Sequence, residues 1–441
     1  LNELTKEDLI RLTLNFQGKY RQILNKSIQS NSKLQTLREK LQPKKKRKVR
    51  SVNFDSFMFR RIALKIAYLG WDYEGLQENE NLDDTIERIL RVALRGVRLV
   101  PPDCDVYFSR CGRTDKEVSA FSQVIVVNVR SKLSAGPESN MENNRLEDTQ
   151  TIEVANETEY DYPVMLNRVL PAEINVIAWA PIEDEQFSAR RHCLGREYRY
   201  YFHQGNANVS AMNDAAKRFC GLHDFRNFGK VNVVNCVNYV RRIEHFDIMS
   251  PLPSDNLTNP YQICYARIIG SGFIYHQVRS MMAVLYLIGI GLENSDVITQ
   301  LLDIETHPKK PWFGLVKPQS LVLFDSLYDN IQWRVSETSA VRFLENIQSY
   351  WSDLDLKSRL TLELVKLTEN DETIRVETEN GTTTTYKDIA DSLCKNLNHG
   401  VNKKLLTDCF KLKREGYKKL LDRPAGKTLG EHLEHAVRKK R

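Results

Sequence analysis

The sequence predicts an α+β protein, and three observations point to that class. Strand-like runs rich in β-branched and aromatic residues recur along the chain, separated by segments with helical periodicity. These elements do not follow the regular βαβ rhythm of a parallel sheet. The 441 residues are 41% apolar and 27% charged, which excludes a disordered or fibrous protein. No run of about 18 apolar residues is present, so we expect no membrane-spanning helix and no membrane partner.

The N-terminal region combines helical periodicity with a strong positive charge. Apolar residues at helical spacing predict an interaction helix over residues 5–41, broken near Ser27–Ser32. A dense basic run follows at Pro43–Val49, and residues 1–50 hold 14 Lys and Arg against 4 Asp and Glu. Such a run binds phosphates or, through Lys44–Lys48, a nuclear import receptor, unless it is a solvated linker. We therefore predict a helix and basic arm at 1–52 and a protein of nucleus and cytoplasm.

The next part of the chain reads as two sheet-plus-helix subdomains, at 53–185 and 186–335. Asp83–Thr85 cap a helix whose apolar residues, from Ile86 to Val97, share one face. A second long apolar helix is expected at 273–288 and a shorter one at 211–219. Strands are predicted by composition at 57–68, 106–109, 121–129, 174–180, 197–202, 240–249, 261–269 and 322–327.

Two further segments differ from this core. Residues 131–161 hold eight acidic and two basic residues, which predicts a disordered surface insertion. From 336 to 441 the pattern changes to helices rich in Leu and Lys around a polar hairpin, so we expect an appended helical region. The eight cysteines form no C-x-x-C pair, which argues against a zinc site or a secreted disulfide framework and for a reducing compartment.

The first cluster that could carry chemistry surrounds Asp115. This carboxylate lies between predicted strands and is flanked in sequence by Arg110, Arg113 and Lys116. Nearby cations favour the ionised form, which suits a nucleophile or an electrostatic stabiliser. A surface turn held by salt bridges is the alternative.

The second cluster interleaves arginines with aromatic residues. Arg190 and Arg191 precede a predicted strand in which Tyr198 and Tyr200 share one face while Arg199 takes the other. This composition suits phosphate contact with base stacking. One core face and one solvated face would give the same pattern.

The third cluster is a glycine-containing turn, Gly270–Gly272, that leads into an apolar helix. Arg279 lies in that apolar stretch, so it needs a buried anionic partner. His276 is interpreted as a core or helix-end histidine, because no second metal ligand stands at helical spacing.

Together the three clusters resemble, in order and spacing, the motifs of the tRNA pseudouridine synthase A family. The resemblance covers about 57–330 and rests on Gly112–Asp115, Arg196-x-Tyr198-x-Tyr200 and His276–Arg279. Other segments resemble the eukaryotic branch that modifies uridines 38 and 39 of the tRNA anticodon arm; these are Arg110-Cys111, Lys116, Ser119–Phe121 and Gly221–Phe228 with Lys230. The resemblance implies a pseudouridine-synthase-like core around a central cleft, a homodimer, tRNA as substrate, and no cofactor or metal.

The resemblance also implies roles for individual residues. Asp115 would be the nucleophile, Tyr198 would stack on the flipped uracil, and Arg279 would pair with Asp115. Arg113 would hold the extruded nucleotide, and Leu323 would line the pocket in a segment where Ser320 replaces the usual glycine. Further RNA contacts are assigned to the basic side chains Arg110, Lys116, Arg190, Arg191 and Lys230.

One departure from the family pattern leaves two hypotheses open. Glu117 stands where the family usually has glycine. A positive φ there would cost about 1 kcal/mol or more, and the added charge would raise the pKa of Asp115. The protein is then either an active tRNA-uridine isomerase or a tRNA-binding or chaperone protein with weakened catalysis. An aspartic hydrolase is a poor third hypothesis, because no second Asp-containing motif offers a paired carboxylate.

Overall fold

The computed structural model describes residues 33–41, 52–79, 82–132, 159–234, 238–249, 261–377, 381–395 and 417–440. The basic run at 43–49, most of the helix predicted at 5–41 and most of the insertion predicted at 131–161 lie outside the described residues. The described part of the N-terminal helix is α2 (Lys33–Leu41), which buries Leu34 and Leu37 against α3 (Ile86–Gly96).

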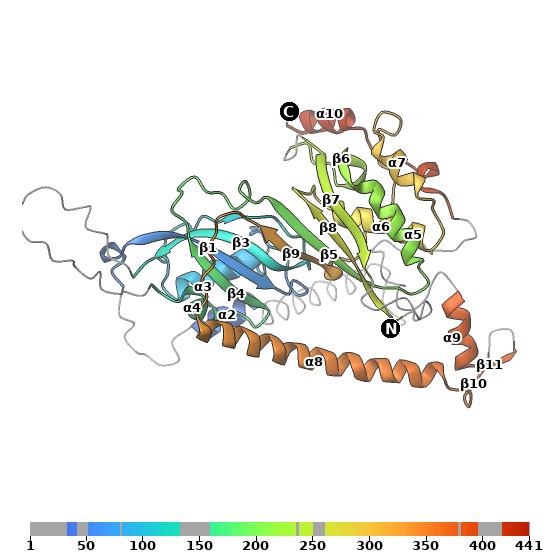
Figure 1. The fold of residues 1–441 in the computed structure, drawn as a ribbon, viewed down its shortest axis with the longest axis horizontal. Coiled ribbons are helices and arrows are strands. Elements are labelled where there is room, and N and C mark those ends of the chain that lie inside the picture. Colours follow the sequence, from blue (N-terminus) through green and yellow to red (C-terminus); the bar gives the residue numbers. More distant parts are fainter. Residues whose placement is uncertain are drawn as a thin grey trace, which may run out of the picture.

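A mixed sheet of nine strands runs through the described part of the chain (Figure 1). Its order is β4-β1-β3-β9-β5-β8-β7-β6, with the short β2 paired to β3. All pairs are antiparallel except β3 with β9. The strands are β1 (Phe59–Tyr68), β2 (Ser109–Arg110), β3 (Ser119–Arg130), β4 (Ile174–Pro181), β5 (Gly195–His203), β6 (Gly221–Asp224), β7 (Val240–Met249), β8 (Ile263–Gly270) and β9 (Leu321–Leu327).

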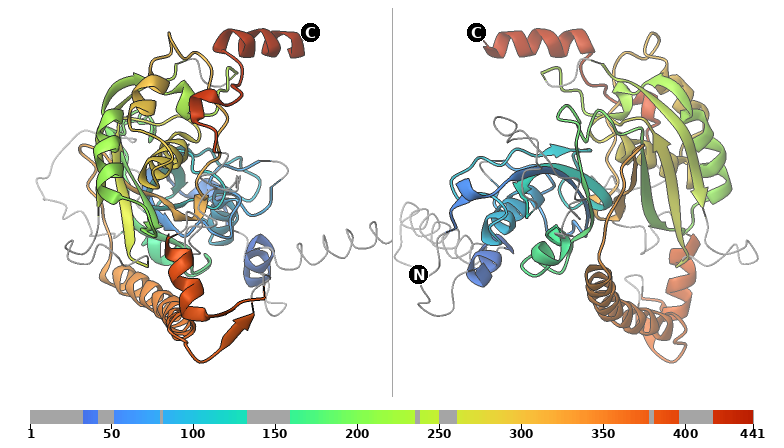
Figure 2. Two further views of the ribbon diagram at one scale, coloured as in Figure 1. Left: turned by 90° about the vertical axis from the view of Figure 1, so that its right-hand side faces the viewer. Right: turned by 60° about the vertical axis from the view of Figure 1, so that its left-hand side comes forward.

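Helices cover both halves of this sheet (Figure 2). On the β1 half, α4 (Tyr162–Asn167) packs on β4, and α3 carries α2. On the β5 half, α5 (Val209–Ala216) packs on β7 and on α6 (Gln277–Gly289), and α7 (Asp296–Leu302) follows. The predicted α+β class is confirmed. The domain boundaries stay predictions, since one sheet passes through both expected subdomains.

Strand β9 joins the two halves and brings two of the motifs together. Leu323 lies opposite Ala120 of β3 on one side and opposite Tyr198 of β5 on the other. The turn that holds Asp115 ends where β3 begins, at Ser119. Asp115 and Tyr198 therefore meet across a single intervening strand, although they are far apart in sequence.

Most predicted bounds differ from the structure by one to three residues, and two elements differ in a way that affects the site. The strand expected at 106–109 is reduced to β2, because only Ser109 and Arg110 pair with β3. The helix expected at 273–288 begins only at Gln277, because His276 has a left-handed backbone with φ 66°. The turn before the helix is therefore longer than its apolar residues indicated.

The C-terminal region leaves the sheet and then returns to it. Helix α8 (Glu337–Glu369) starts beside β4 and runs along the molecule to the hairpin β10 (Arg375–Glu377) and β11 (Thr383–Thr385) and to α9 (Tyr386–Lys395) (Figure 1). Residues 417–426 return to the β5 half, where Leu420 is fully buried, and α10 (Leu429–Lys440) follows. None of the helices in these ranges has the length and apolar composition needed to cross a membrane.

Candidate active site

Asp115 lies in a turn that is fixed from both sides by neighbouring backbone. The hydroxyl groups of Tyr68 and Thr114 share a hydrogen bond of 2.7 Å, and the Leu76 N–H donates to the Thr114 carbonyl at 3.2 Å. Gly75 has φ +96°, and a Cβ there would lie 3.0 Å from the Thr114 carbonyl oxygen. Only glycine allows this approach at low cost, so the turn presents Asp115 in a defined direction.

Helix α6 and the residue just before it supply the groups that face Asp115. Arg279 Nη1 and His276 Nε2 each lie 3.6 Å from Asp115 Oδ2. The Arg279 side chain is buried, and its Nε donates to the Val316 carbonyl at 2.8 Å. The anionic partner that a buried arginine requires is therefore Asp115, and the bond to Val316 fixes the orientation of the guanidinium.

Burial sets the ionisation of this pair. Loss of solvent raises the pKa of Asp115 above its ordinary value of 3.8, and the Arg279 charge opposes that shift. Burial, and then the charges of Arg279 and two lysines, lowers the pKa of His276 to about 4. The imidazole is therefore uncharged near pH 7, and Arg279 is the cation that stabilises the carboxylate.

The sequence interpretation of the neighbouring cations was wrong in one respect. Arg110 and Lys116 do not face Asp115, because each has another carboxylate partner. Lys116 Nζ lies 2.7 Å from Glu74 Oε1, and Arg110 Nε lies 2.5 Å from Glu87 Oε1. The charges adjacent in sequence therefore contribute little to the ionisation of Asp115.

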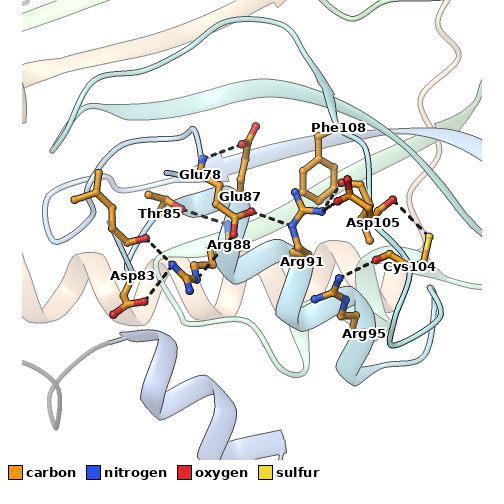
Figure 3. A network of polar contacts seen from close by, with 12 residues as sticks. Glu78, Asp83, Thr85, Glu87, Arg88, Arg91, Arg95, Cys104, Asp105 and Phe108 are labelled. Atoms are coloured by element: carbon orange, nitrogen blue, oxygen red, sulfur yellow. Dashed lines mark hydrogen bonds and ion pairs between the residues drawn. The ribbon is translucent and has the colours of Figure 1, made fainter. Parts of the chain in front are cut away.

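Glu87 belongs to a polar network that fixes α3 against the loops before β2 (Figure 3). Its buried carboxylate accepts a hydrogen bond of 2.9 Å from the Glu78 N–H, and burial raises its pKa. Arg91 donates to the Glu78 carboxylate at 2.9 Å and to the Val106 carbonyl. Arg110 compensates the charge of the buried Glu87, so the contact that the structure shows for Arg110 is a structural one.

Tyr198 and Leu323 form the apolar side of the site. The Tyr198 ring meets Phe273 edge-on at 5.0 Å between centroids, and Leu323 is fully buried beside it. A Cβ on Gly112 would lie 4.0 Å from the Tyr198 hydroxyl oxygen. Tyr198 therefore stands directly beside the turn that carries Asp115, where a planar base could stack on it.

Arg196 holds the three motifs together, a role that the sequence interpretation missed. It is buried, and its guanidinium donates to the carbonyls of Cys111 at 2.8 Å, Arg190 at 3.1 Å and Ser271 at 2.6 Å. One side chain thus fixes the turn that carries Asp115, the loop that carries Arg190 and Arg191, and the turn before α6. Side chains two residues apart in a strand lie on the same face, so Arg196 is buried on the same face as Tyr198. This alternation was the sequence signal from which the burial of Arg196 could have been predicted.

The remaining basic residues lie at the surface around the site. Arg113, Arg190 and Arg191 are exposed. Partial burial, and then the charges of Arg110 and Arg190, lower the pKa of Arg113. Lys230 is exposed on the α6 side, with Nζ 5.6 Å from the centre of the Tyr275 ring. This distribution suits a polyanion better than a small neutral ligand.

Glu117 has the positive φ expected at a glycine position, but its charge is turned away. Its φ is 65°, and its N–H donates to the Tyr73 carbonyl at 3.0 Å. The carboxylate accepts a hydrogen bond of 2.5 Å from Gln319 Nε2. Burial and not this carboxylate raises the pKa of Asp115, which corrects the expectation from the sequence.

Glu117→Gly is therefore expected to leave activity within about threefold of the wild-type rate. Relief of the left-handed strain, about 1 kcal/mol, is offset by loss of the bond to Gln319 and by the flexibility of glycine. We expect the free energy of unfolding to change by less than about 1 kcal/mol in urea titrations. Glu117→Val is the contrasting variant, because a β-branched residue tolerates this φ worst. Equal stability of the two variants would contradict the strain argument.

A partly buried carboxylate beside a guanidinium and an aromatic ring, with exposed arginines around it, is typical of an enzyme that acts on a nucleic acid base. A family model described as tRNA pseudouridine synthase matches residues 215–329. The chain belongs to the tRNA pseudouridine synthase family and is an isomerase, which confirms the family expected from the motifs.

Curated relatives cover most of the chain. It is 36% identical to the tRNA pseudouridine(38/39) synthase of Bos taurus over 94% of this chain and 85% of the relative. The human enzyme of the same name is 36% identical over 89% of this chain and 80% of its own length. The enzyme of that name from Saccharomyces cerevisiae is 32% identical over 80% of this chain and 78% of its own length.

Proposed function

We propose that this protein converts uridines 38 and 39 of the tRNA anticodon arm into pseudouridine, with Asp115 as the nucleophile. The names of the relatives support the substrate. The observation that carries the mechanism is the contact of 3.6 Å between Asp115 and Arg279, inside a site that also holds Tyr198.

The reaction requires a glycosidic bond to move without oxidation. The N1–C1′ bond breaks, the uracil turns, and C5 bonds to C1′; the proton on C5 is lost to solvent and N1 gains one. A fixed carboxylate assists the first cleavage, either by attack on C1′ or by removing a sugar proton to give an eliminated intermediate. Asp115 is active in its charged form in both routes.

The surrounding residues keep that form available and give the base a place to turn. Arg279 opposes the effect of burial on Asp115. Tyr198 offers a ring on which the extruded uracil stacks, and the exposed Arg113 reaches toward the extruded nucleotide. A loop nucleotide is less stacked than a duplex base and costs least to extrude, which agrees with a target in the anticodon arm.

Tritium release from tRNA labelled at C5 of uridine tests this proposal. We expect release from the purified protein, with pseudouridine found at positions 38 and 39 by sequencing-based mapping. Absence of release, together with tight and salt-sensitive tRNA binding, would support the alternative of a tRNA-binding or chaperone protein. Glu117 motivated that alternative, and its orientation toward Gln319 counts against it.

We also propose that the protein is a homodimer that acts in nucleus and cytoplasm. The dimer follows from the family resemblance, and the location follows from the basic run at Lys44–Lys48. Light scattering at the monomer mass would contradict the first statement. Unchanged nuclear fluorescence after deletion of residues 43–49 would contradict the second.

A further inference from the structure

Lys310 is a cationic side chain at the active site for which neither the motifs nor the proposed reaction gives a role. It is half-buried, in the loop between α7 and β9. Its Nζ donates to the Gly229 carbonyl at 3.2 Å and to Ser280 Oγ at 3.3 Å, next to Arg279 in the first turn of α6. Two of its three N–H donors are thus used on neutral oxygens, and one is left for another acceptor.

The described residues provide no ion pair for Lys310. Burial lowers its pKa to about 8, so it still carries its charge near pH 7. Buried cations are normally paired with an anion. Lys310 therefore keeps a positive charge in a place where the described part of the chain offers it a carbonyl, a hydroxyl and the face of Phe313.

The charges around His276 are strongly unbalanced. Arg279, Lys230 and Lys310 all act on its imidazole, whereas Asp115 is the carboxylate in contact with it. Gly229 lets the loop that carries Lys230 lie close to the turn before α6. A Cβ at position 229 would lie 2.2 Å from Ile274 Cδ1. With a larger residue at 229, the Ile274 side chain would have to shift for the loop that carries Lys230 to keep this close approach to the turn before α6.

The C-terminal segment holds the Lys310 loop in place. The Gly426 N–H donates to the Lys310 carbonyl at 2.8 Å, and the Trp312 N–H donates to the Pro424 carbonyl at 3.0 Å. Leu420 anchors this segment, because its side chain is fully buried and its N–H donates to the buried Glu293 carboxylate at 2.8 Å. The returning chain thus positions a cation beside the active site from outside the catalytic motifs.

We propose that Lys310 Nζ binds a backbone phosphate adjoining the target uridine, and that the C-terminal segment fixes it for this contact. The inference rests on the proposed function, which brings an RNA chain to Asp115. When Asp115 meets C1′ of the extruded nucleotide, the phosphates on either side of that nucleotide are the nearest anions. One of these phosphates would balance the excess positive charge around His276.

Binding of an anticodon-arm RNA to the full-length protein tests this contact. In an Asp115→Asn background, Lys310→Met is expected to weaken binding roughly tenfold. It should also reduce the slope of log K against log salt by about 0.7 to 0.9, the value for one phosphate. Lys309→Met is the matched control, because Lys309 is the exposed neighbour and pairs with Glu431 at 3.3 Å. That control should bind within about twofold.

A second measurement identifies the phosphate. One uncharged methylphosphonate linkage is placed on the 5′ or the 3′ side of the target uridine. At one of these positions the protein with Lys310 should lose about tenfold in affinity, whereas the Lys310→Met protein should lose nothing further. Lys310→Arg should restore the sensitivity to that linkage, and Lys310→Gln serves if the Met variant does not fold.

The outcomes separate this inference from the proposed function. If wild-type protein releases tritium but the Lys310→Met and Lys309→Met variants bind alike, the phosphate contact is overturned and the proposed function stands. If each methylphosphonate linkage weakens binding equally in the protein with Lys310 and in the Lys310→Met protein, the contact is also overturned. A third outcome is that wild-type protein releases no tritium while the effects of Lys310→Met and of one methylphosphonate linkage on binding are coupled. In that case the proposed reaction is overturned and the phosphate contact stands.

Discussion

Asp115→Asn is expected to abolish pseudouridine formation while tRNA binding survives. The amide keeps the size of the side chain but cannot attack C1′ or accept a sugar proton. Removing a nucleophile usually costs on the order of 10⁴-fold or more, so single-turnover tritium release should fall to background. The dissociation constant for tRNA should change by less than about threefold, because Asp115 faces the Arg279 guanidinium and the uncharged His276 imidazole, and it binds no phosphate of the RNA.

The adjoining carboxylate supplies the control for this experiment. Glu117→Gln removes the same charge two residues away, from a side chain held by Gln319. We expect it to retain activity within a few-fold. An Asp115→Asn protein that still releases tritium at the Glu117→Gln rate would overturn the assignment of Asp115.

The fold and the main site residues could be predicted because they are encoded locally. Apolar and β-branched runs give the strands, and alternation along β5 places Tyr198 on the buried face. A guanidinium among apolar residues of α6 required an anion, and the structure provides Asp115. Each of these statements depends on a short window of sequence, where periodicity and burial are directly related.

The electrostatics of the site could not be predicted in the same way. Arg110 and Lys116 adjoin Asp115 in sequence, yet their partners are Glu87 and Glu74, which come from other segments. The left-handed backbone of His276 is also invisible to apolar periodicity. Which charge faces which is decided by tertiary packing, so adjacency in the chain was a poor guide.

The surroundings of Lys310 are even harder to predict from sequence than those of Asp115. Its loop has no strand or helix pattern of its own, and it is held by Gly426 and Pro424 from the far end of the chain. The appended C-terminal region therefore could not be connected to the site from sequence. Contacts between such distant segments require the folded arrangement of both.

Arg279→Met is expected to lower the rate at pH 7 by about 100-fold or more, and raising the pH should recover part of the loss. Breaking a buried ion pair leaves an uncompensated charge, at a cost of about 3 to 5 kcal/mol. Asp115 can avoid that cost by taking up a proton, so its pKa should rise further than burial alone has raised it. At pH 7 fewer molecules then hold the active carboxylate.

The pH dependence gives the sign of this effect. The ionised form reacts, so the rate should increase with pH through the Asp115 pKa and then level off. In Arg279→Met the inflection should move to higher pH. Because the folded pKa is raised, the linked contribution of Asp115 to stability is present at low pH and is lost as pH rises through that pKa.

Two variants show whether the guanidinium acts through Asp115. Arg279→Lys keeps a cation and should retain most of the wild-type profile, although it loses the bond to the Val316 carbonyl. His276→Gln should leave the inflection in place, since burial already keeps the imidazole uncharged with a pKa of about 4. If Arg279→Met lowers the rate equally at every pH, the guanidinium contacts the substrate directly and does not tune the carboxylate.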